Sequence, residues 1–373
     1  MELIEKYIKS LMDNSTPDCP VWNIEKIRAG KKSDWDYIDG CMILAFLEFY
    51  KVRKDKAYFD FAKGYLDHRI GPSGEIKGFN EDAYNLDNVN AGKNLLTLYT
   101  LTQEEKYRLA AERVYSQVKN QPRTKEGNFW HKKIYPHQVW LDGLYMVMPF
   151  YIGYANLFMD DKEKAKVYKD VYSQFFNVER LMRDKETGLY YHAYDSSREM
   201  FWCDKETGLS KNFWLRALGW FQMAMLDSLL LLEDKDSSEH KHLEGMFKDL
   251  LESMLKFQDK NGMFFQLPAY PGKEKNYHET SGSAIFSYCV NKGFKEGLLD
   301  EKFKEAGDRC FKGICDEYLR DDAGSMSLGG ICLVAGLGGR DMRDGTYDYY
   351  MSEPVVKDDA KGTAPFILAY LYQ

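Results

Sequence analysis

The sequence predicts an all-α protein folded as an (α/α)6 barrel, with short strands or loops at one rim. Six apolar segments each begin with a glycine and are hydrophobic on nearly every side, and they alternate with six amphipathic stretches that have one apolar face. Because helices that are apolar all round must be enclosed, the economical arrangement is an inner ring of six helices inside an outer ring. The sequence has no linker-like segment, which favours a single domain over residues 1–373.

The elements follow one another as a loose repeat. The glycines that begin the expected inner helices are 51 to 80 residues apart, a spacing typical of arrays of helix pairs. These glycines are Gly40, Gly92, Gly143, Gly219, Gly282 and Gly362. One-faced helices are expected at about 1–13, 58–66, 104–120, 162–178, 243–254 and 300–318. The segments GNFWH, GLYYHAYD and GMFFQLP are expected to form short strands or hairpins at one rim.

The residues just before these glycines are expected to meet at one mouth of the barrel. They are Asp39, Asp87 with Asn88, Asp142, Arg216, Glu279 with Thr280, and Asp358 with Asp359. Tryptophan, tyrosine and phenylalanine make up 15% of the chain, and their rings stack well on the apolar faces of sugars. Any one of these acidic residues is readily explained as a helix cap. Their repeated placement together favours a shared sugar-binding cleft.

Composition excludes several other classes of protein. The net charge is −7 and no run is rich in lysine or arginine, so no nucleic acid or anionic membrane partner is expected. No apolar stretch is long enough to span a membrane. Seven thinly spread cysteines are expected to be reduced thiols, and the N-terminus lacks the features of a signal peptide, so we expect a cytoplasmic protein. No partner protein is indicated, and a monomer is expected.

The sequence gives no sign of a metal or a cofactor. His240 and His242 lie in a charged run, while Cys310 and Cys315 share one amphipathic helix without a histidine partner nearby. A glycine-rich phosphate loop, a G-x-S-x-G elbow and a dinucleotide-binding fingerprint are all absent from the sequence. Kinases, serine hydrolases and dehydrogenases are therefore disfavoured.

The segment NFWHKKIYPHQVWLDGLYMVMPF, residues 128–150, holds the first candidate for an acid–base residue. Asp142 lies between Trp140 and the glycine that begins an inner helix. A carboxyl group that is half desolvated there would favour its protonated form and could act as a general acid. The spacing alone fits equally well with Asp142 as the N-cap of the helix.

Two further segments could contact a ligand. Arg216 lies between Trp214 and Trp220 at another helix start, where it could bind a substrate carboxylate through two parallel hydrogen bonds or form a structural ion pair. The indoles on both sides favour the ligand role. His192 in GLYYHAYD could bind sugar hydroxyls or tune a neighbouring acid, although a lone histidine is more often structural.

Five motifs in an unchanged order resemble a known family. LDNVNAG, WHKKIYPHQVWLDGLYM, GLYYHAYD, FWLRALGW and HETSGSA are similar to segments of the unsaturated rhamnogalacturonyl hydrolases, glycoside hydrolase family 105, to which the unsaturated glucuronyl hydrolases of family 88 are related. The resemblance runs from about Trp35 to the C-terminus. It implies an (α/α)6 barrel and, as substrate, a small oligosaccharide left by pectin-type lyases, with a 4,5-unsaturated uronic acid at its non-reducing end.

The resemblance also assigns residues. It places the catalytic aspartate of the W-x-D-G-L-Y motif on Asp142 and the aspartate of the L-D-x-x-x-A-G motif on Asp87. The WHK motif corresponds to His131 and Lys132, and the histidine of the YHA motif corresponds to His192. The R-x-x-G-W motif supplies Arg216 and Trp220. By the same resemblance, Trp140, Trp214, Trp35, Asp36 and Tyr37 would line the unsaturated sugar. The family often has histidine at the position of Asp36, and the stretch Ala335–Gly345 has no clear counterpart.

The chemistry implied by the resemblance takes place at the C4=C5 double bond. Asp142 would protonate C4 and then accept a proton from the water that adds at C5, so one residue acts first as acid and then as base. Asp87 would help Asp142 to hold its proton and orient the water, while Arg216 and Lys132 would neutralise the uronate. The alternatives are a conventional inverting glycosidase or a polysaccharide lyase on the same barrel, and a sugar-binding barrel without catalysis. The sugar next to the uronate is left open.

Overall fold

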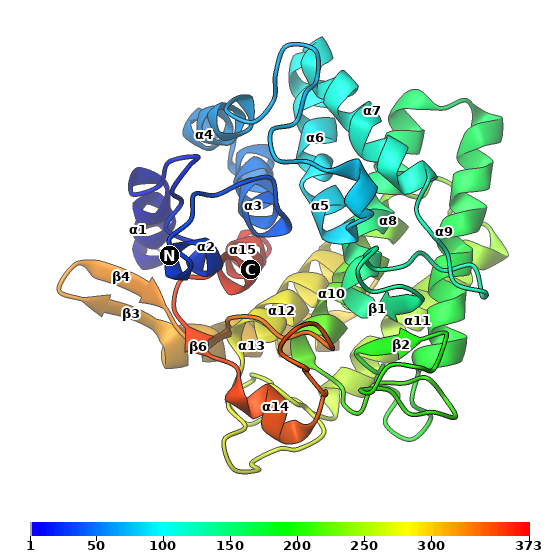
Figure 1. Ribbon diagram of the computed structural model, residues 1–373. Coiled ribbons are helices and arrows are strands. Elements are labelled where there is room, and N and C mark those ends of the chain that lie inside the picture. Colours follow the sequence, from blue (N-terminus) through cyan, green and yellow to red (C-terminus); the bar gives the residue numbers. More distant parts are fainter. Residues whose placement is uncertain (1) are drawn as a thin grey trace.

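A computed structural model describes residues 2–373. Figure 1 shows a ring of inner helices surrounded by outer ones. The inner helices are α3 (Tyr37–Arg53), α6 (Gly92–Thr102) with the short α5 (Leu86–Asn90) before it, α8 (Leu141–Phe158), α10 (Leu215–Leu231), α12 (Thr280–Lys295) and α15 (Ala360–Leu371). Each inner helix packs against the next, and α15 packs against α3 to close the ring. The expected (α/α)6 barrel is confirmed.

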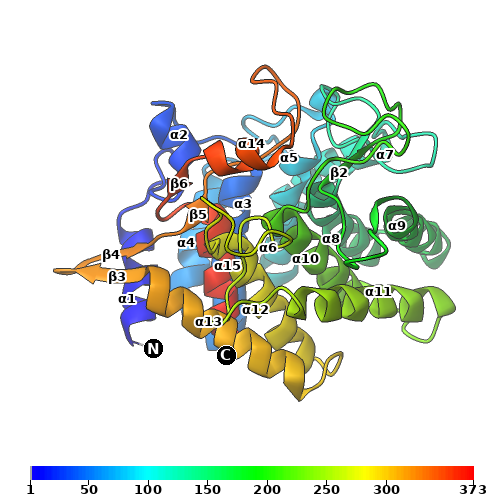
Figure 2. The same ribbon diagram turned by 90° about the horizontal axis from the view of Figure 1, so that it is seen from below.

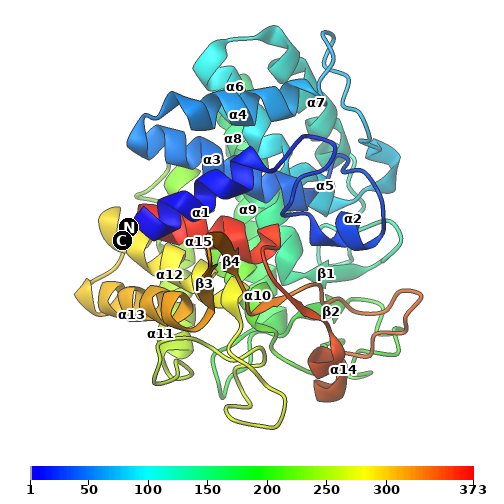
Figure 3. The same cartoon turned by 90° about the vertical axis from the view of Figure 1, so that its left-hand side faces the viewer.

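The outer helices are the amphipathic ones. They are α1 (Glu2–Asp13), α4 (Lys56–Asp67), α7 (Glu105–Lys119), α9 (Asp161–Met182), α11 (Ser238–Leu255) and α13 (Glu301–Tyr318). Helices α4, α7, α9, α11 and α13 each pack on the inner helix that precedes them in the chain. Helix α1 lies beside the last inner helix (Figure 3), and the Tyr370 hydroxyl donates a hydrogen bond to Glu5 across this contact at 2.8 Å. The first and last helices therefore complete the sixth hairpin.

One end of the barrel carries the irregular structure. Figure 2 shows α2 (Ile24–Arg28), α14 (Tyr347–Ser352) and the longer loops at this end, and the two chain ends at the opposite end. A 3₁₀ turn, η1 (Glu81–Ala83), precedes α5. Within residues 2–373, no helix combines the length and the apolar content that crossing a bilayer requires.

Short strands form at this end, but not all where the sequence predicts them. Strand β1 (Gln138–Trp140) pairs antiparallel with β2 (Ala193–Asp195). The antiparallel pairs β3 (Leu319–Asp322) with β4 (Ser325–Leu328), and β5 (Ile331–Cys332) with β6 (Val355–Val356), are not predicted. Of the three predicted segments, GLYYHAYD contributes β2, whereas GNFWH and GMFFQLP make only single bridges at Phe129 and Phe265. Those two segments instead lie in turns that connect helices.

The repeated glycines permit close contacts between neighbouring elements of the inner ring. A Cβ atom at Gly40 in α3 would lie 2.9 Å from the Cα and Cβ of Ala91, closer than real Cβ contacts allow. A Cβ at Gly282 would lie 2.4 Å from the Leu215 side chain at the start of α10, and one at Gly362 would lie 2.6 Å from Ile331. The repeat seen in the sequence thus reflects a steric requirement at the ends where the inner helices begin.

Replacing Gly40 with alanine is expected to lower the free energy of unfolding by about 1–3 kcal/mol, because the added methyl group overpacks the contact with Ala91. Gly64→Ala in outer helix α4 is the matched control. Among the residues described, its Cβ would meet no heavy atom within 4 Å beyond its own helix backbone, so it is expected to stabilise by about 0.5–1 kcal/mol. Chemical denaturation of both variants measures the difference. Equal effects of the two substitutions would contradict this account.

Candidate active site

A cavity of about 140 Å³ lies at the barrel end where the inner helices begin. It is lined by Glu25, Tyr37, Asp87, His131, Lys132, Tyr135, Trp140, Asp142, Met146, Trp214, Arg216, Trp220, Val334, Ala335, Gly336 and Arg343. The residues that the family resemblance assigns to the site all line this cavity except Trp35, Asp36 and His192. The fold therefore brings together residues that are far apart in the chain and that the sequence alone assigned to one cleft.

Asp87 lies in the first turn of α5 and carries a fixed negative charge. Its carboxylate is 2.5 Å from the Lys132 ammonium and 3.4 Å from His131 Nε2. Burial alone would raise the pKa of Asp87, but the charge of Lys132 and its hydrogen bond hold that pKa below its ordinary value. Asp87 and Lys132 thus form an ion pair in the cavity wall.

His131 is held as a neutral base beside this pair. Burial lowers the pKa of His131 to about 4, because Asp87 only partly offsets the loss of solvation. Its ring stacks on Trp140, with centroids 4.7 Å apart, and Tyr135 stacks on the same indole at 5.3 Å. A Cβ at Gly143 would lie 3.0 Å from His131 Nδ1, so the glycine of the W-x-D-G-L-Y motif leaves room for this imidazole.

Asp142 has different surroundings, although it lies in the same cavity. It is the second residue of α8, and 14% of its side chain is exposed. Within residues 2–373, its carboxyl group contacts His192, whose Nε2 lies 3.3 Å from Asp142 Oδ2. No hydrogen bond joins this carboxylate oxygen to the rest of the described chain, so Asp142 does not cap the helix through it. The carboxyl group is left to interact with a ligand.

The pairing of β1 with β2 brings Asp142 and His192 together. Trp140 at the end of β1 lies opposite Ala193 in β2, and the Leu141 amide donates a hydrogen bond to the His192 carbonyl at 3.2 Å. This two-stranded ladder joins the start of α8 to the loop that carries the histidine. His192 itself is fully buried and does not line the cavity. It therefore acts on a ligand only through Asp142.

Tyr350 of α14 orients His192. The Tyr350 hydroxyl and His192 Nδ1 are 2.7 Å apart. Burial raises the pKa of Tyr350 well above its ordinary value, so the phenol stays protonated and can donate a hydrogen bond to a bare Nδ1. We infer from this network that the other nitrogen, Nε2, carries the ring hydrogen that faces Asp142. Sequence analysis missed Tyr350, which belongs to no motif and reaches the site only through the fold.

Tyr350→Phe is expected to reduce kcat about tenfold with little change in KM, because His192 loses the hydrogen bond that sets its tautomer beside Asp142. Initial rates at several substrate concentrations separate kcat from KM. Tyr349→Phe, which removes the neighbouring hydroxyl bonded to the Gly336 amide, serves for comparison. A Tyr350→Phe enzyme with wild-type kcat would contradict the positioning role.

Arg216 lies at the start of α10 with its cationic group over the Trp214 ring, 4.6 Å from the ring centroid. Its Nη1 donates hydrogen bonds to the Cys332 carbonyl at 2.5 Å and to Ser281 Oγ at 3.3 Å. These acceptors are neutral, and among the residues described Arg216 makes no ion pair. The guanidinium thus lines the cavity with a positive charge that no direct contact with a carboxylate neutralises.

The two tryptophans of this segment are almost completely buried. Trp214 is 1% exposed and Trp220 is 2% exposed, and Trp220 stacks on Tyr145 with centroids 4.9 Å apart. The indole nitrogen of Trp214 has no hydrogen-bond partner within residues 2–373. A buried N–H group without a partner in a cavity wall is a candidate donor to a ligand oxygen.

Several of the acidic residues expected at this mouth serve the fold instead. Asp36 does not line the cavity: its carboxylate caps α3 by accepting hydrogen bonds from the Asp39 amide at 3.0 Å and from Asn23 Nδ2 at 3.2 Å. Glu279 caps α12, and Asp359 pairs with Lys361 at 2.9 Å. For these positions the helix-cap interpretation applies.

The structure adds Arg343 to the cavity. This residue comes from the stretch Ala335–Gly345, which has no clear counterpart among the family motifs. An isolated bridge between Gly338 and Arg343 turns the chain back on itself, and the Arg343 side chain lies 3.3 Å from Asp341. The sequence marked this stretch only by its lack of a family counterpart, which predicts no direction for a side chain.

Comparison with known proteins decides the family. The sequence model of the protein family named Glycosyl Hydrolase Family 88 matches residues 4–372 of this chain. The solved structure of a family 105 glycoside hydrolase from C. acetobutylicum ATCC 824 matches with a TM-score of 0.90 and 39% identity, covering 100% of this chain and 98% of that chain. The chain belongs to glycoside hydrolase family 105. This family 105 protein is therefore a member of the unsaturated uronyl hydrolases, which act on oligosaccharides.

Two curated relatives are also similar to this family 105 protein. Protein Atu3128 of Agrobacterium fabrum (strain C58) is 38% identical over 232 residues, which are 60% of this chain and 97% of that protein. The unsaturated rhamnogalacturonyl hydrolase YesR of Bacillus subtilis (strain 168) is 27% identical over 269 residues, which are 69% of this chain and 71% of that protein. The family resemblance inferred from the five motifs is confirmed.

Proposed function

We propose that this family 105 enzyme removes the 4,5-unsaturated galacturonyl residue from the non-reducing end of lyase-generated rhamnogalacturonan fragments. The observation that carries the proposal is the contrast between two carboxyl groups in one cavity. Asp87 is held as a carboxylate by Lys132, whereas the short contact of Asp142 is with the His192 ring. Different surroundings commonly give two carboxyl groups different roles. The similarity to YesR supports the choice of substrate.

The reaction begins with proton transfer to carbon. In an unsaturated uronate the C4=C5 bond is a vinyl ether conjugated with the ring oxygen, so protonation at C4 leaves a cation at C5 that the ring oxygen stabilises. Asp142 donates this proton, and the His192 N–H beside it stabilises the carboxylate that remains. No carboxylate has to attack C1, unlike in retaining glycosidases that form a glycosyl–enzyme intermediate.

Water completes the reaction at C5. The oxygen of the water bonds to C5 while the Asp142 carboxylate accepts one proton from that water. This step returns Asp142 to its acid form. The resulting hemiketal opens by breaking the bond between C5 and the ring oxygen. The hemiacetal left at C1 then collapses to an aldehyde and releases the neighbouring sugar as an alcohol. Asp87 lines the same cavity, and in the proposed reaction it accepts a hydrogen bond from this water.

One cation of the cavity wall has no direct carboxylate partner among the described residues. Asp87 pairs with Lys132, and Glu25 shares Lys361 with Asp359. Arg216 is left as a cation whose direct partners are neutral oxygen atoms. A guanidinium group without an ion-pair partner is well suited to bind a planar carboxylate.

The experiment follows the ultraviolet absorbance of the C4=C5 bond in a purified reaction. The substrates are an unsaturated rhamnogalacturonan disaccharide, the same disaccharide with a saturated galacturonyl end, and an unsaturated glucuronyl disaccharide. We expect rapid loss of absorbance with the first substrate and no sugar release from the second. Faster reaction of the glucuronyl compound would overturn the rhamnogalacturonan assignment, and cleavage of the saturated disaccharide would overturn the chemistry.

A further inference from the structure

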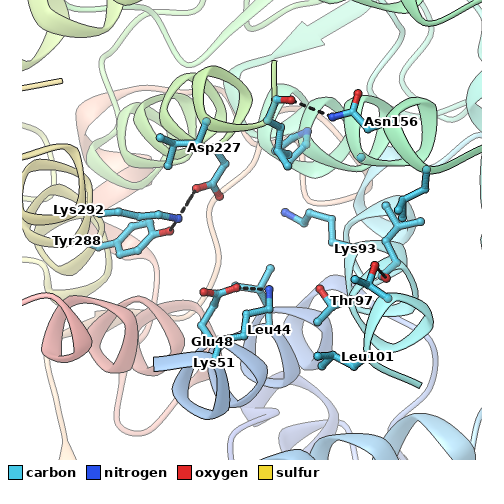
Figure 4. A pocket seen from close by; sticks show the side chains of 17 residues that line it. Leu44, Glu48, Lys51, Lys93, Thr97, Leu101, Asn156, Asp227, Tyr288 and Lys292 are labelled. Atoms are coloured by element: carbon cyan, nitrogen blue, oxygen red, sulfur yellow. Dashed lines mark hydrogen bonds and ion pairs between the residues drawn. The ribbon is translucent and has the colours of Figure 1, made fainter. Parts of the chain in front are cut away.

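A second pocket lies at the opposite end of the barrel from the candidate active site. Its volume is about 380 Å³, which falls within the usual range for small-molecule sites. Most of the residues around it come from the later turns of α3, α6, α8, α10 and α12, whereas the active-site cavity lies where the inner helices begin. We call it the far-end pocket, and Figure 4 shows its side chains. It is lined by Leu44, Glu48, Lys51, Lys93, Leu96, Thr97, Thr100, Leu101, Pro149, Gly153, Asn156, Leu157, Asp227, Leu230, Leu231, Tyr288 and Lys292.

Among the charged side chains that line the far-end pocket, one cation has no anionic partner in the described part of the chain. Glu48 pairs with Lys51 at 2.6 Å, and Asp227 pairs with Lys292 at 3.2 Å. Figure 4 shows both pairs at the sides of the pocket, with the amine of Lys93 projecting into the space between them. Lys93 forms no ion pair in the part of the chain that the structure describes. The pocket therefore carries one unmatched positive charge.

Lys93 is an unusual residue to bury without an anion. It is 8% exposed, and its ammonium donates a hydrogen bond to the Tyr145 carbonyl at 3.3 Å and lies 3.4 Å from the centroid of the Tyr145 ring. Both contacts are to neutral groups. Burial lowers the pKa of Lys93 to about 8, and the more distant Cys41 and Asp227 offset this only in part. A bound carboxylate would supply the missing counter-charge in a site where water screens little.

The residues that line the far-end pocket indicate what kind of group the rest of the ligand carries besides its carboxylate. Their apolar part comes from six leucines of α3, α6, α8 and α10 together with Pro149, and Tyr288 adds one aromatic ring. The active-site cavity, in contrast, has three tryptophans in its wall, and none lines the far-end pocket among residues 2–373. Aromatic rings stack on sugars, whereas branched aliphatic side chains favour a hydrocarbon chain. An aliphatic ligand therefore fits these walls better than a second saccharide.

We propose that the far-end pocket is a binding site for a small aliphatic monocarboxylate, whose carboxylate contacts Lys93 and whose hydrocarbon chain packs on the surrounding leucines. This site goes beyond the proposed hydrolase function and does not depend on it. The C-terminal ends of the inner helices carry partial negative charge at this end of the barrel and would favour a cation instead. The full charge of Lys93 outweighs these partial charges, because it projects into the pocket itself.

The site also touches the active-site wall through a chain of two contacts. The Lys93 ammonium packs on the Tyr145 ring, and that ring stacks on Trp220, which lines the active-site cavity. The two sites are therefore separate, but they share one aromatic pair.

The test is isothermal titration calorimetry of the full chain with hexanoate, 1-hexanol and hexylamine, which share one chain length and differ in charge. We expect hexanoate to bind once per chain and at least about tenfold more tightly than either of the others, because only it pairs with Lys93. If hexanol or hexylamine binds as tightly as hexanoate, or if hexanoate does not bind at millimolar concentration, the proposal is overturned. This comparison needs no variant and so does not depend on one folding.

A variant then assigns the charge to one residue. Lys93→Met keeps the length of the side chain and removes its charge, and it is expected to weaken hexanoate binding at least about tenfold. Lys63→Met on the outer helix α4 removes one lysine charge outside the pocket, and it is expected to leave hexanoate affinity within about twofold of the wild type, since the charge it removes does not contact the ligand. Thermal unfolding of both variants checks that they fold. Wild-type affinity in Lys93→Met would show that the lysine does not hold the carboxylate.

Discussion

Asp142→Asn is expected to lower kcat at least about 10²–10⁴-fold on an unsaturated disaccharide, while KM changes little. Asparagine has nearly the same shape as aspartate but cannot donate a proton to C4 or accept one from water. The His192 contact at 3.3 Å and the placement of α8 do not depend on the lost proton, so binding is retained. Initial rates of absorbance loss at several substrate concentrations separate the two parameters.

Asp170→Asn is the matched control for this experiment. Asp170 lies on outer helix α9, where it pairs with Arg123 at 2.6 Å, and it does not line the cavity. The change from carboxylate to amide is the same, so its kcat is expected to stay within about twofold of the wild type, because surface ion pairs contribute little. An Asp142→Asn enzyme that keeps more than a tenth of the wild-type kcat would exclude Asp142 as the proton donor.

Asp87→Asn is expected to lower kcat about 10²-fold, the second largest effect in this account. The substitution removes the negative charge that holds Lys132 at 2.5 Å and faces His131 at 3.4 Å. The Lys132 ammonium is then left without its partner beside the reacting centre, where it opposes the positive charge that develops at C5. The expected result is a loss in kcat larger than any change in KM, measured in the same assay.

Lys132→Met in the Asp87→Asn background separates the two contributions. If the unpaired ammonium causes part of the loss, removing it restores some of the rate, whereas loss of a water-orienting carboxylate is not restored. An Asp87→Asn enzyme with wild-type kcat would show that the ion pair is only structural.

The inner ring could be predicted because its steric demands are local. Gly40, Gly282 and Gly362 each lie against a neighbouring element where no Cβ fits, so the same residue type recurs at the same place in each repeat. Asp87 and Asp142 follow from the same regularity, since each stands at the start of an inner helix that faces the cavity. The spacing of residues along the chain therefore predicted both the fold and the positions of the two carboxyl groups.

The remaining features depend on contacts that sequence spacing does not encode. Tyr350 meets His192 across 158 positions of the chain, and Arg343 enters the cavity from a glycine-rich loop. Asp36 was expected at the sugar, but its carboxylate accepts a hydrogen bond from the Asp39 amide in the first turn of its own helix. Lys93 follows Gly92 in the sequence like any polar residue at a helix start, and only the closed barrel shows that it is buried without an anion.

The most direct test of the central claim is the reaction in D₂O, followed by proton nuclear magnetic resonance of the sugar released from the non-reducing end. Proton donation by Asp142 to C4 predicts a product with a single deuterium at C4 in one configuration, formed at the rate of sugar release, and no such product with Asp142→Asn. Release of a sugar that still has its C4=C5 bond, without deuterium at C4, would contradict hydration of the double bond and indicate direct cleavage at C1.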